Sequence, residues 1–238
     1  MKIFFPFPTP ILRGEFVSRP QRFLVEVKME DGRRVVAYCA NPGSFGCSFE
    51  KGSRILLWKS PDRKRKREFT WRAIRIKAAW VGTDTHLANQ LVGKALMEKL
   101  LPPFHGFDLE KTEPRASRRR RLDFLLRRRN ERYFVEVKSV AVSNHSVARF
   151  PDSKSSRARA HIMELIAQTR AGNRAAIIFL VQRGDVNFVQ IRSEFDPNFA
   201  EACVEAKHTG VQLLGVKHHV SARGFGPPVM IPVTIAGE

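Results

Sequence analysis

The hydrophobic pattern of this chain changes once, near Gly82, and this change constrains the fold more than any other feature of the sequence. Before Gly82, short alternations of apolar and polar residues, separated by turn residues, predict strands at residues 23–30, 34–38, 54–59 and 69–77. Four or five strands in so short a span favour a small closed or partly open barrel. The sequence therefore predicts an OB-like barrel at residues 1–82.

After Gly82, helical periodicity alternates with apolar strands. Three helices are expected, from residues 83–85 to 100, at 156–171 and at 196–210. Strands are expected at residues 122–126, 133–138, 175–181, 186–191 and 211–216, of which the wholly apolar 175–181 is typical of a strand buried on both faces. This interleaving predicts an α/β sheet domain at residues 83–238, and thus a two-domain protein of mixed α+β and α/β class.

The balance of charge points to a polyanionic partner. The chain has 42 Lys and Arg against 23 Asp and Glu, a formal net charge of +19 over 238 residues. Such a protein repels itself unless a polyanion neutralises it, so nucleic acid or an anionic membrane is the first partner to consider.

A membrane partner is less well supported by the sequence. The longest uncharged stretch, residues 224–237, contains three prolines and is shorter than a membrane-spanning helix requires. The apolar N-terminus is also interrupted by prolines and is not read as a signal peptide. Three cysteines without a metal-binding spacing, at positions 39, 47 and 203, are expected to be free thiols in a reducing compartment. We therefore expect a cytoplasmic protein.

Two segments carry much of the positive charge. Residues 62–77 have a net charge of +6 and lie beside several aromatic residues, and residues 115–131 also have a net charge of +6. Clustered Lys and Arg neutralise phosphates, and nearby aromatic rings can stack on exposed bases. The candidate DNA contacts are Arg63, Lys64, Arg65, Lys66, Arg67, Trp71, Arg118, Arg119, Arg120 and Arg121. Alternatively the runs are solvated loops, residues 63–67 are a nuclear-localisation signal, and the aromatic residues are barrel core.

A carboxylate pair and a lysine form the candidate catalytic site. Glu136 and Lys138 alternate with Val137 on an expected strand, so both side chains project from one face. Asp123 lies on the preceding strand, and a symmetric hairpin that turns near Arg129 and Asn130 places it directly opposite Glu136. Two carboxylates at that distance repel each other unless a cation or a proton lies between them.

The residue types at this site suit a hard divalent cation. Asp123 and Glu136, with Glu113 as an additional candidate ligand, offer the oxygen ligands that Mg²⁺ or Mn²⁺ takes. Lys138 would then position or deprotonate an attacking water, while the metal stabilises charge on a phosphate. The alternative is that both carboxylates simply pair with the many arginines nearby.

The order of elements in this region resembles the core of PD-(D/E)xK nucleases. The whole chain is also similar to the sugar fermentation stimulation protein A family, whose members share several short motifs with it. These motifs are Arg-Phe-Leu-Val-Glu-Val at 22–27, Cys-Ala-Asn-Pro-Gly-Ser at 39–44, Arg-Lys-Arg-Lys at 63–66, Thr-Trp at 70–71, Arg-Leu-Asp-Phe at 121–124, Tyr-Phe-Val-Glu-Val-Lys at 133–138, Phe-Pro-Asp at 150–152 and Asp-Pro at 196–197. The resemblance implies an OB-like N-terminal domain, a restriction-endonuclease-like C-terminal domain and DNA binding.

The chain departs from the family pattern at three places. Tyr38 and Ala40 stand where the family has His and Pro, Phe45 stands where it has Met, and residues 157–161 read Arg-Ala-Arg-Ala-His in place of Arg-Gly-Gln-Lys-His. The loss of the Gln-Lys pair argues against a role for that helix in holding metal or phosphate. Arg157 and Arg159 remain candidate phosphate contacts, as does His161, although a lone histidine is more often a packed helix residue.

Two functions follow, with a third left open. The first is a DNA-binding protein of little sequence preference, with the regulatory role in sugar (maltose) use that the resemblance implies. The second is a Mg²⁺- or Mn²⁺-dependent DNA endonuclease that uses Asp123, Glu136 and Lys138. The third is RNA binding by the barrel. The sequence indicates no organic cofactor and no small-molecule ligand.

Overall fold

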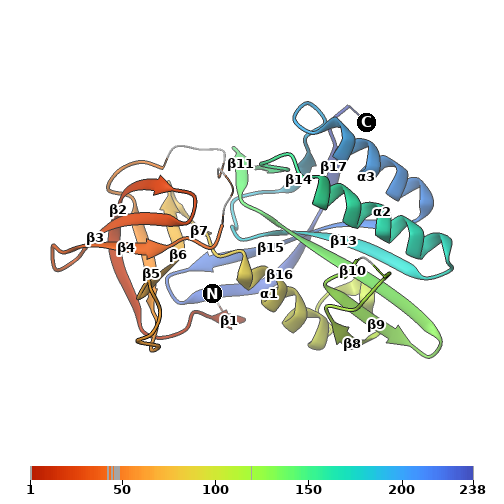
Figure 1. The fold of residues 1–238 in the computed structure, drawn as a ribbon, viewed down its shortest axis with the longest axis horizontal. Coiled ribbons are helices and arrows are strands. Elements are labelled where there is room, and N and C mark those ends of the chain that lie inside the picture. The colour runs from red at the N-terminus through yellow and green to blue at the C-terminus, as the bar shows by residue number, and fades with distance from the viewer. Residues whose placement is uncertain (1, 42, 44, 46–48, 119, 238) are drawn as a thin grey trace. The chain divides into compact units, whose positions relative to one another are not determined.

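The computed structural model describes residues 2–41, 43, 45, 49–118 and 120–237 (Figure 1). The chain forms two compact units, and each contains segments that are far apart in the sequence. The first comprises Met1–Leu87, Gln182–Asp185 and His218–Pro227, and the second comprises Ala88–Val181, Val186–Lys217 and Pro228–Glu238. Two of the residues singled out above, Cys47 and Arg119, lie outside the described residues.

The first unit is built around a barrel. Its strands are β2 (Ile11–Gln21), β3 (Leu24–Met29), β4 (Arg34–Tyr38), β5 (Arg54–Lys59), β6 (Phe69–Ile76) and β7 (Ala79–Gly82). They are hydrogen-bonded in the order β4-β3-β2-β5-β6-β7, and β4 also pairs with β6. The bridge between Tyr38 and Thr70 closes the five strands β2 to β6 into a barrel, which is the closed Greek-key arrangement of an OB fold.

Aromatic side chains fill the barrel. Trp71 is fully buried, and the ring centroids of Phe16 and Phe49 lie 6.1 Å and 5.3 Å from its own. Gly14 allows β2 and β3 to cross closely, because a Cβ there would lie 2.7 Å from the Lys28 carbonyl oxygen. The long strand β2 can therefore pair with both β3 and β5.

The remaining strands of the first unit come from the ends of the chain. β1 (Phe5–Pro6) pairs antiparallel with β16 (Gly224–Ile231), Phe5 lying opposite Phe225. Within the same unit Phe7 packs edge-on against Phe225, with ring centroids 5.2 Å apart. The apolar N-terminus is therefore a structural part of this unit.

The second unit is an α/β domain. Its first elements are α1 (His86–Met97), which begins at the end of the first unit, the 3₁₀ turn η1 (Pro102–Phe104), β8 (Asp108–Thr112), β9 (Phe124–Arg128), β10 (Glu131–Val140), β11 (Val142–Asn144) and β12 (Val147–Phe150). It continues with α2 (Ser156–Arg170), β13 (Arg174–Val181), β14 (Phe188–Ile191), α3 (Pro197–Thr209), β15 (Gln212–Ser221) and β17 (Val233–Ile235). Of β15, residues 212–217 belong to this unit and residues 218–221 to the first.

Parallel strands form the centre of the main sheet. β13 lies between β10 and β15 and runs parallel to both, while β9 and β8 continue the sheet antiparallel beyond β10. A smaller sheet has the order β11-β12-β14-β17. Helices α2 and α3 of this domain lie side by side (Figure 1), and their residues Leu165 and Phe199 are fully buried in its core.

Capping residues define the ends of α2 and α3, and those of α3 lie at the predicted positions 196 and 210. The Ser155 hydroxyl accepts a hydrogen bond from the Ala158 N–H at the start of α2, and Asp196 caps α3 by accepting from Phe199. Gly210 ends α3 with a φ of 99°, which favours glycine. Among the described residues, no helix combines the length and apolar character needed to cross a bilayer. The predicted fold class, an OB barrel followed by an α/β sheet domain, is confirmed.

Candidate active site and nucleic-acid interface

A β-hairpin brings the two carboxylates together. Strands β9 and β10 pair with Phe124 opposite Val135 and with Arg128 opposite Glu131, and the turn between them includes Arg129 at a φ of 52°. Asp123 immediately precedes β9, and its backbone N–H donates to the Val135 carbonyl over 3.1 Å. This is the hairpin register expected from the sequence.

Glu136 is held by two basic side chains. Its side chain is only 3% exposed, and Oε1 accepts hydrogen bonds from Lys138 Nζ, at 2.5 Å, and from His161 Nδ1. Burial alone would raise the pKa of Glu136, but the hydrogen bond from His161 and the charge of Lys138 outweigh it and lower the pKa. Oε2 is buried and has no hydrogen-bond partner among the described residues. One oxygen of this carboxylate thus accepts two hydrogen bonds, whereas the other accepts none from the described residues.

Asp123 has a different environment. Oδ1 accepts from Asn89 Nδ2 and Oδ2 accepts from the Val137 N–H, each over 2.7 Å. Burial and, after it, the charge of Glu136 raise the pKa of Asp123 to about 6, against the lowering effect of these two hydrogen bonds and Lys138. The pKa of Asp123 is therefore raised while that of Glu136 is lowered, and such perturbed pKa values are typical of functional sites.

Glu113, the additional candidate ligand, is separate from this pair. Its backbone N–H donates to the Asp123 carbonyl over 2.9 Å, but its side chain is 71% exposed and lies 3.6 Å from Arg121. Within the described part of the chain, no group of three acidic, histidine or cysteine side chains is arranged to hold a metal ion. A role for Glu113 as a third ligand therefore needs its side chain to turn.

Arginines lead directly into the carboxylate site. Residues 114–122, which we call the arginine loop, connect Glu113 to Asp123. Within this loop the Leu122 N–H donates to the Pro114 carbonyl over 3.1 Å. Gln168 of α2 anchors the loop by donating to the Ala116 carbonyl over 2.8 Å. Of the predicted contacts in this loop, Arg118 and Arg121 are exposed and Arg120 is half-buried, whereas Arg119 lies outside the described residues.

Two further candidates, Arg157 and Arg159, are exposed in the first turns of α2. Arg157 stands one helical turn before His161, on the same face of the helix. His161 itself contacts the site, because Lys138 Nζ lies 3.4 Å from its Nδ1. The helix therefore takes part in the site, although the expected Gln-Lys pair is missing from it.

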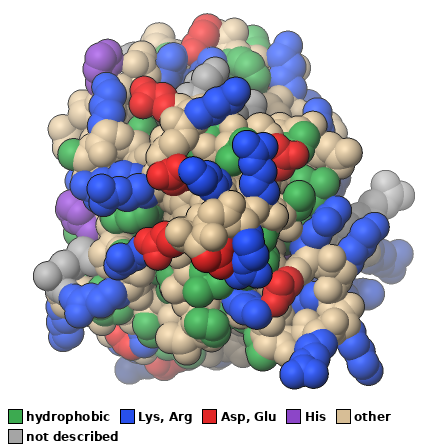
Figure 2. Space-filling view, turned by 90° about the vertical axis from the view of Figure 1, so that its left-hand side faces the viewer, with side chains coloured by type: hydrophobic (Ala, Val, Ile, Leu, Met, Phe, Trp, Pro, Cys, Tyr) green, Lys and Arg blue, Asp and Glu red, His purple; other side chains and the backbone are tan. Residues whose placement is uncertain are grey.

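The other basic run joins β5 to β6. We call residues 60–68 the basic loop: Arg63, Lys64 and Lys66 are exposed, and Arg65 and Arg67 are half-buried. Figure 2 shows Lys and Arg side chains spread over one face of the molecule, with a few acidic groups between them. The prediction that Trp71 contacts DNA is wrong, because this side chain is fully buried and its Nε1 donates to the Ala73 carbonyl.

Sequence reasoning missed Asn89 as a participant in the site, and it considered His161 without its actual partner. Asn89 comes from α1, and its spacing along that helix gave no sign of a polar role. His161 was weighed as a packed residue, and it is indeed 8% exposed, but its partner is the Glu136 carboxylate. Both contacts depend on how helices pack against the hairpin, which no local pattern encodes.

An OB barrel followed by a restriction-endonuclease-like α/β domain, with Asp and Glu-x-Lys on adjoining strands, defines the class of this two-domain protein. A family model described as the SfsA N-terminal OB domain matches residues 17–83, and one described as the sugar fermentation stimulation protein RE domain matches residues 86–224. The chain belongs to the sugar fermentation stimulation protein family, as the resemblance implied.

Individual relatives span nearly the whole chain. A sugar fermentation stimulation protein homolog of Thioalkalivibrio sulfidiphilus is 38% identical over 87% of this chain and 89% of its own length. The homolog of Geotalea uraniireducens is 33% identical over 92% of this chain and 94% of its own length. The solved structure of Pyrococcus furiosus SfsA in complex with Ca²⁺ has a TM-score of 0.85 and 26% identity, covering 98% of this chain and 99% of that one.

Proposed function

We propose that this protein is a divalent-metal-dependent DNA nuclease whose site consists of Asp123, Glu136 and Lys138. The observation that carries the proposal is the bare, buried Oε2 of Glu136, beside a second carboxylate whose pKa its charge raises. A buried acceptor without a donor is costly, and a bound cation would satisfy it. The Ca²⁺ in the similar Pyrococcus furiosus structure supports an affinity of this fold for hard cations.

The residues present fit such a cation. Asp123 and the free oxygen of Glu136 would hold it, and Mg²⁺ or Mn²⁺ accepts a few carboxylate oxygens while keeping several water ligands. The bound ion would supply Lewis-acid stabilisation of the phosphate and a more acidic water.

The side chains around the pair have definable roles. Asn89 and the Val137 N–H fix the orientation of Asp123, and His161 fixes that of Glu136. The Lys138 side chain is 15% exposed, so its Nζ can donate a hydrogen bond to an attacking water and orient it towards the phosphate. The exposed arginines of the arginine loop would bind the flanking phosphates.

Plasmid cleavage tests this proposal. The purified protein is incubated with supercoiled plasmid and Mg²⁺ or Mn²⁺, beside Glu136→Gln and Lys138→Ala. The matched control is the double variant Glu205→Gln/Lys207→Ala, because these residues form another Glu-x-Lys tripeptide on α3. We expect nicking by the wild type and the control, and loss of nicking in both site variants. Cleavage that persists in the site variants, or is absent with both metals, contradicts a nuclease.

A specific observation also favours DNA binding without cleavage. Lys138 and His161 already donate hydrogen bonds to Oε1 of Glu136, so this carboxylate is partly stabilised in the folded site without any metal. In this second candidate the protein binds DNA with little sequence preference and acts as a regulatory factor in sugar use, including maltose. The two basic segments support this binding.

Salt titration tests the DNA binding that both candidates require, and the plasmid assay then separates them. Affinity for a labelled duplex is measured in EDTA at increasing salt, and phosphate contacts predict a negative log–log slope. Strong binding together with an inert site would favour the regulatory candidate. A flat slope at low salt would exclude phosphate binding, and with it both candidates.

A further inference from the structure

A shallow groove on the barrel combines exposed aromatic rings with positive charge. It has a volume of about 440 Å³ and lies between the β2–β3 connection, the end of β4 and the basic loop. The residues that matter in it are Phe23, Tyr38, Arg65, Lys66 and Arg67. Among the residues that the structure describes, no acidic side chain lines it.

The two rings form a flat platform. Phe23 is 48% exposed, which makes it one of the few large apolar side chains of the described chain left open to water. Its ring stacks on Tyr38 with an interplanar angle of 7° and centroids 6.4 Å apart. The ring is thus held in one orientation by its neighbour while its other surface remains free to stack.

The cations stand at the edge of this platform. Arg65 is fixed from behind, because its guanidinium lies 5.6 Å from the Trp58 ring centroid and donates to Thr70 Oγ1 over 3.4 Å. Lys66 is exposed and Arg67 half-buried beside it. A polynucleotide strand presents bases and phosphates alternately, which matches a flat apolar surface bordered by positive charges.

The position of the groove in the fold agrees with this chemistry. Phe23 occupies the connection between the first two barrel strands, and the basic loop joins the last two, β5 and β6. OB folds bind oligonucleotides with these two connections and the adjoining strand face.

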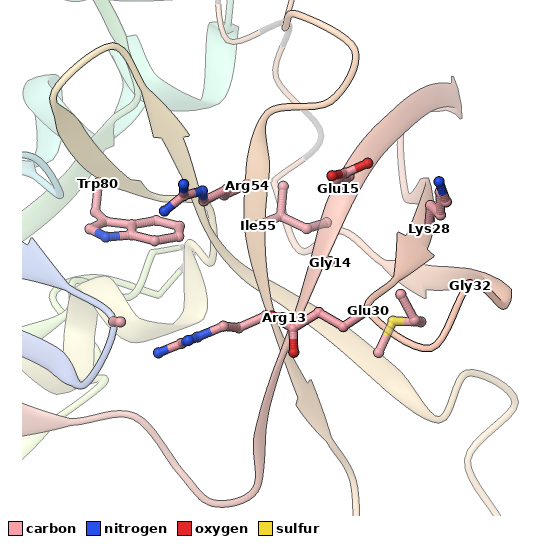
Figure 3. A pocket seen from close by; sticks show the side chains of 11 residues that line it. Arg13, Gly14, Glu15, Lys28, Glu30, Gly32, Arg54, Ile55 and Trp80 are labelled. Atoms are coloured by element: carbon pink, nitrogen blue, oxygen red, sulfur yellow. The ribbon is translucent and has the colours of Figure 1, made fainter.

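A larger hollow on the same unit provides the contrast. It has a volume of about 680 Å³, and both signs of charge line it (Figure 3). Arg13, Lys28 and Arg54 share this hollow with Glu15 and Glu30. Because the acids offset the bases there, this site is less suited to a phosphate chain, and Arg54 serves as a charge-matched control.

We propose that the groove at Phe23 and Tyr38 binds an unpaired segment of single-stranded DNA. One base stacks on the free face of Phe23, and Arg65, Lys66 and Arg67 contact the adjacent phosphates. This inference rests on the proposed DNA-directed function and specifies its substrate as DNA with unpaired bases.

The test is a binding assay with the full-length protein. A fluorescein-labelled oligothymidine and a duplex of equal length are titrated in EDTA, so that no cleavage occurs, and anisotropy is measured. Stacking on one aromatic ring is worth about a 5- to 150-fold change in affinity. We therefore expect Phe23→Ala to weaken single-strand binding by that factor, and to change duplex binding by less than about 2-fold.

Control variants separate stacking from charge and from folding. Phe23→Trp retains a flat ring and should bind single strands at least as well as the wild type. Arg65→Ala should weaken single-strand binding more than Arg54→Ala, although both remove one positive charge. Circular dichroism checks that each variant is folded.

Each other outcome has a distinct meaning. If the wild type binds neither DNA form, the proposed function itself fails. If it binds DNA but Phe23→Ala behaves like Arg54→Ala, the groove proposal is overturned while DNA binding stands. Tighter binding of an RNA of the same length and composition would overturn the assignment of DNA as the occupant.

Discussion

His218 is a fully buried imidazole whose surroundings favour its neutral form, and it links the stability of the first unit to pH. Its ring stacks on Phe4 at 5.6 Å between centroids and meets Phe225 edge-on at 6.2 Å. Nδ1 donates to the Gly226 carbonyl over 2.8 Å, whereas Nε2 is buried with no partner among the described residues. Protonation would thus add a donor at Nε2 that is buried and has no acceptor among the described residues.

The magnitude follows from the pKa. Burial is the main cause that lowers the pKa of His218 from 6.5 to about 4, with the Gly226 carbonyl opposing it. The unfolded chain therefore binds a proton at a higher pH than the folded protein does, so stability is complete above pH 6.5 and falls as the pH drops towards 4. By linkage the loss is about 2 kcal/mol at about pH 5 and approaches about 3 kcal/mol at lower pH.

Tryptophan fluorescence can report this loss. The three tryptophans of the chain, at positions 58, 71 and 80, all belong to the first unit, which also contains His218. Urea unfolding is followed at about pH 7.5 and about pH 5 for the wild type and for His218→Gln, which removes the titrating group and keeps a donor for Gly226. The same substitution at the exposed His219 is the matched control.

The comparison of variants isolates His218 from other titrating groups. The stability difference between wild type and His218→Gln should shift by about 2 kcal/mol in favour of the variant between the two pH values. His219→Gln controls for the loss of an imidazole at an exposed neighbouring position. An unchanged difference for His218→Gln would refute the reasoning that a buried neutral imidazole controls the acid stability of this unit.

Three further predictions concern packing and charge. Arg72→Met removes the arginine that pairs with the buried carboxylate of Asp84 and should lower the free energy of unfolding by about 3–5 kcal/mol, whereas adding Asp84→Asn should restore much of the loss in urea titrations; an additive cycle would contradict the pairing. Gly215→Ala should lower the free energy of unfolding by about 1–3 kcal/mol, measured by thermal melts, because its Cβ would lie 2.6 Å from the Ile231 carbonyl oxygen. An unchanged melting temperature would mean that β15 and β16 move apart at no cost. Arg65→Ala should reduce the steepness of the log–log salt dependence of single-strand binding by about 0.7 if its guanidinium contacts a phosphate, and an unchanged slope would exclude that contact.

The local parts of the candidate site could be predicted from the sequence. The β9–β10 hairpin is symmetric, so the positions of Asp123 and Glu136 relative to its turn were enough to place the two opposite each other. The helix caps at Asp196 and Gly210 were similarly predictable, because a cap depends on residues next to it.

Features that depend on distant packing were not predictable. His161 and Asn89 reach the carboxylates only because α2 and α1 pack near the hairpin. Strand β2 was missed because two irregularities in its pairing, between Phe16 and Gln21, disturb the period-two alternation by which strands are recognised. Counting aromatic residues favoured Trp71, whereas only the fold distinguishes a buried ring from an open one such as Phe23.

The pairing of β1 with β16 has a consequence for synthesis of the protein. A ribosome synthesises Phe5 long before its partner Phe225, because the two are 220 residues apart in the sequence. At a translation rate of about 5–20 residues per second, the apolar N-terminal strand waits roughly 10–45 s for its partner. During that interval the aromatic side chains of Phe5 and Phe7 remain without the Phe225 ring against which they later pack, so this apolar segment stays exposed until its partner strand is made.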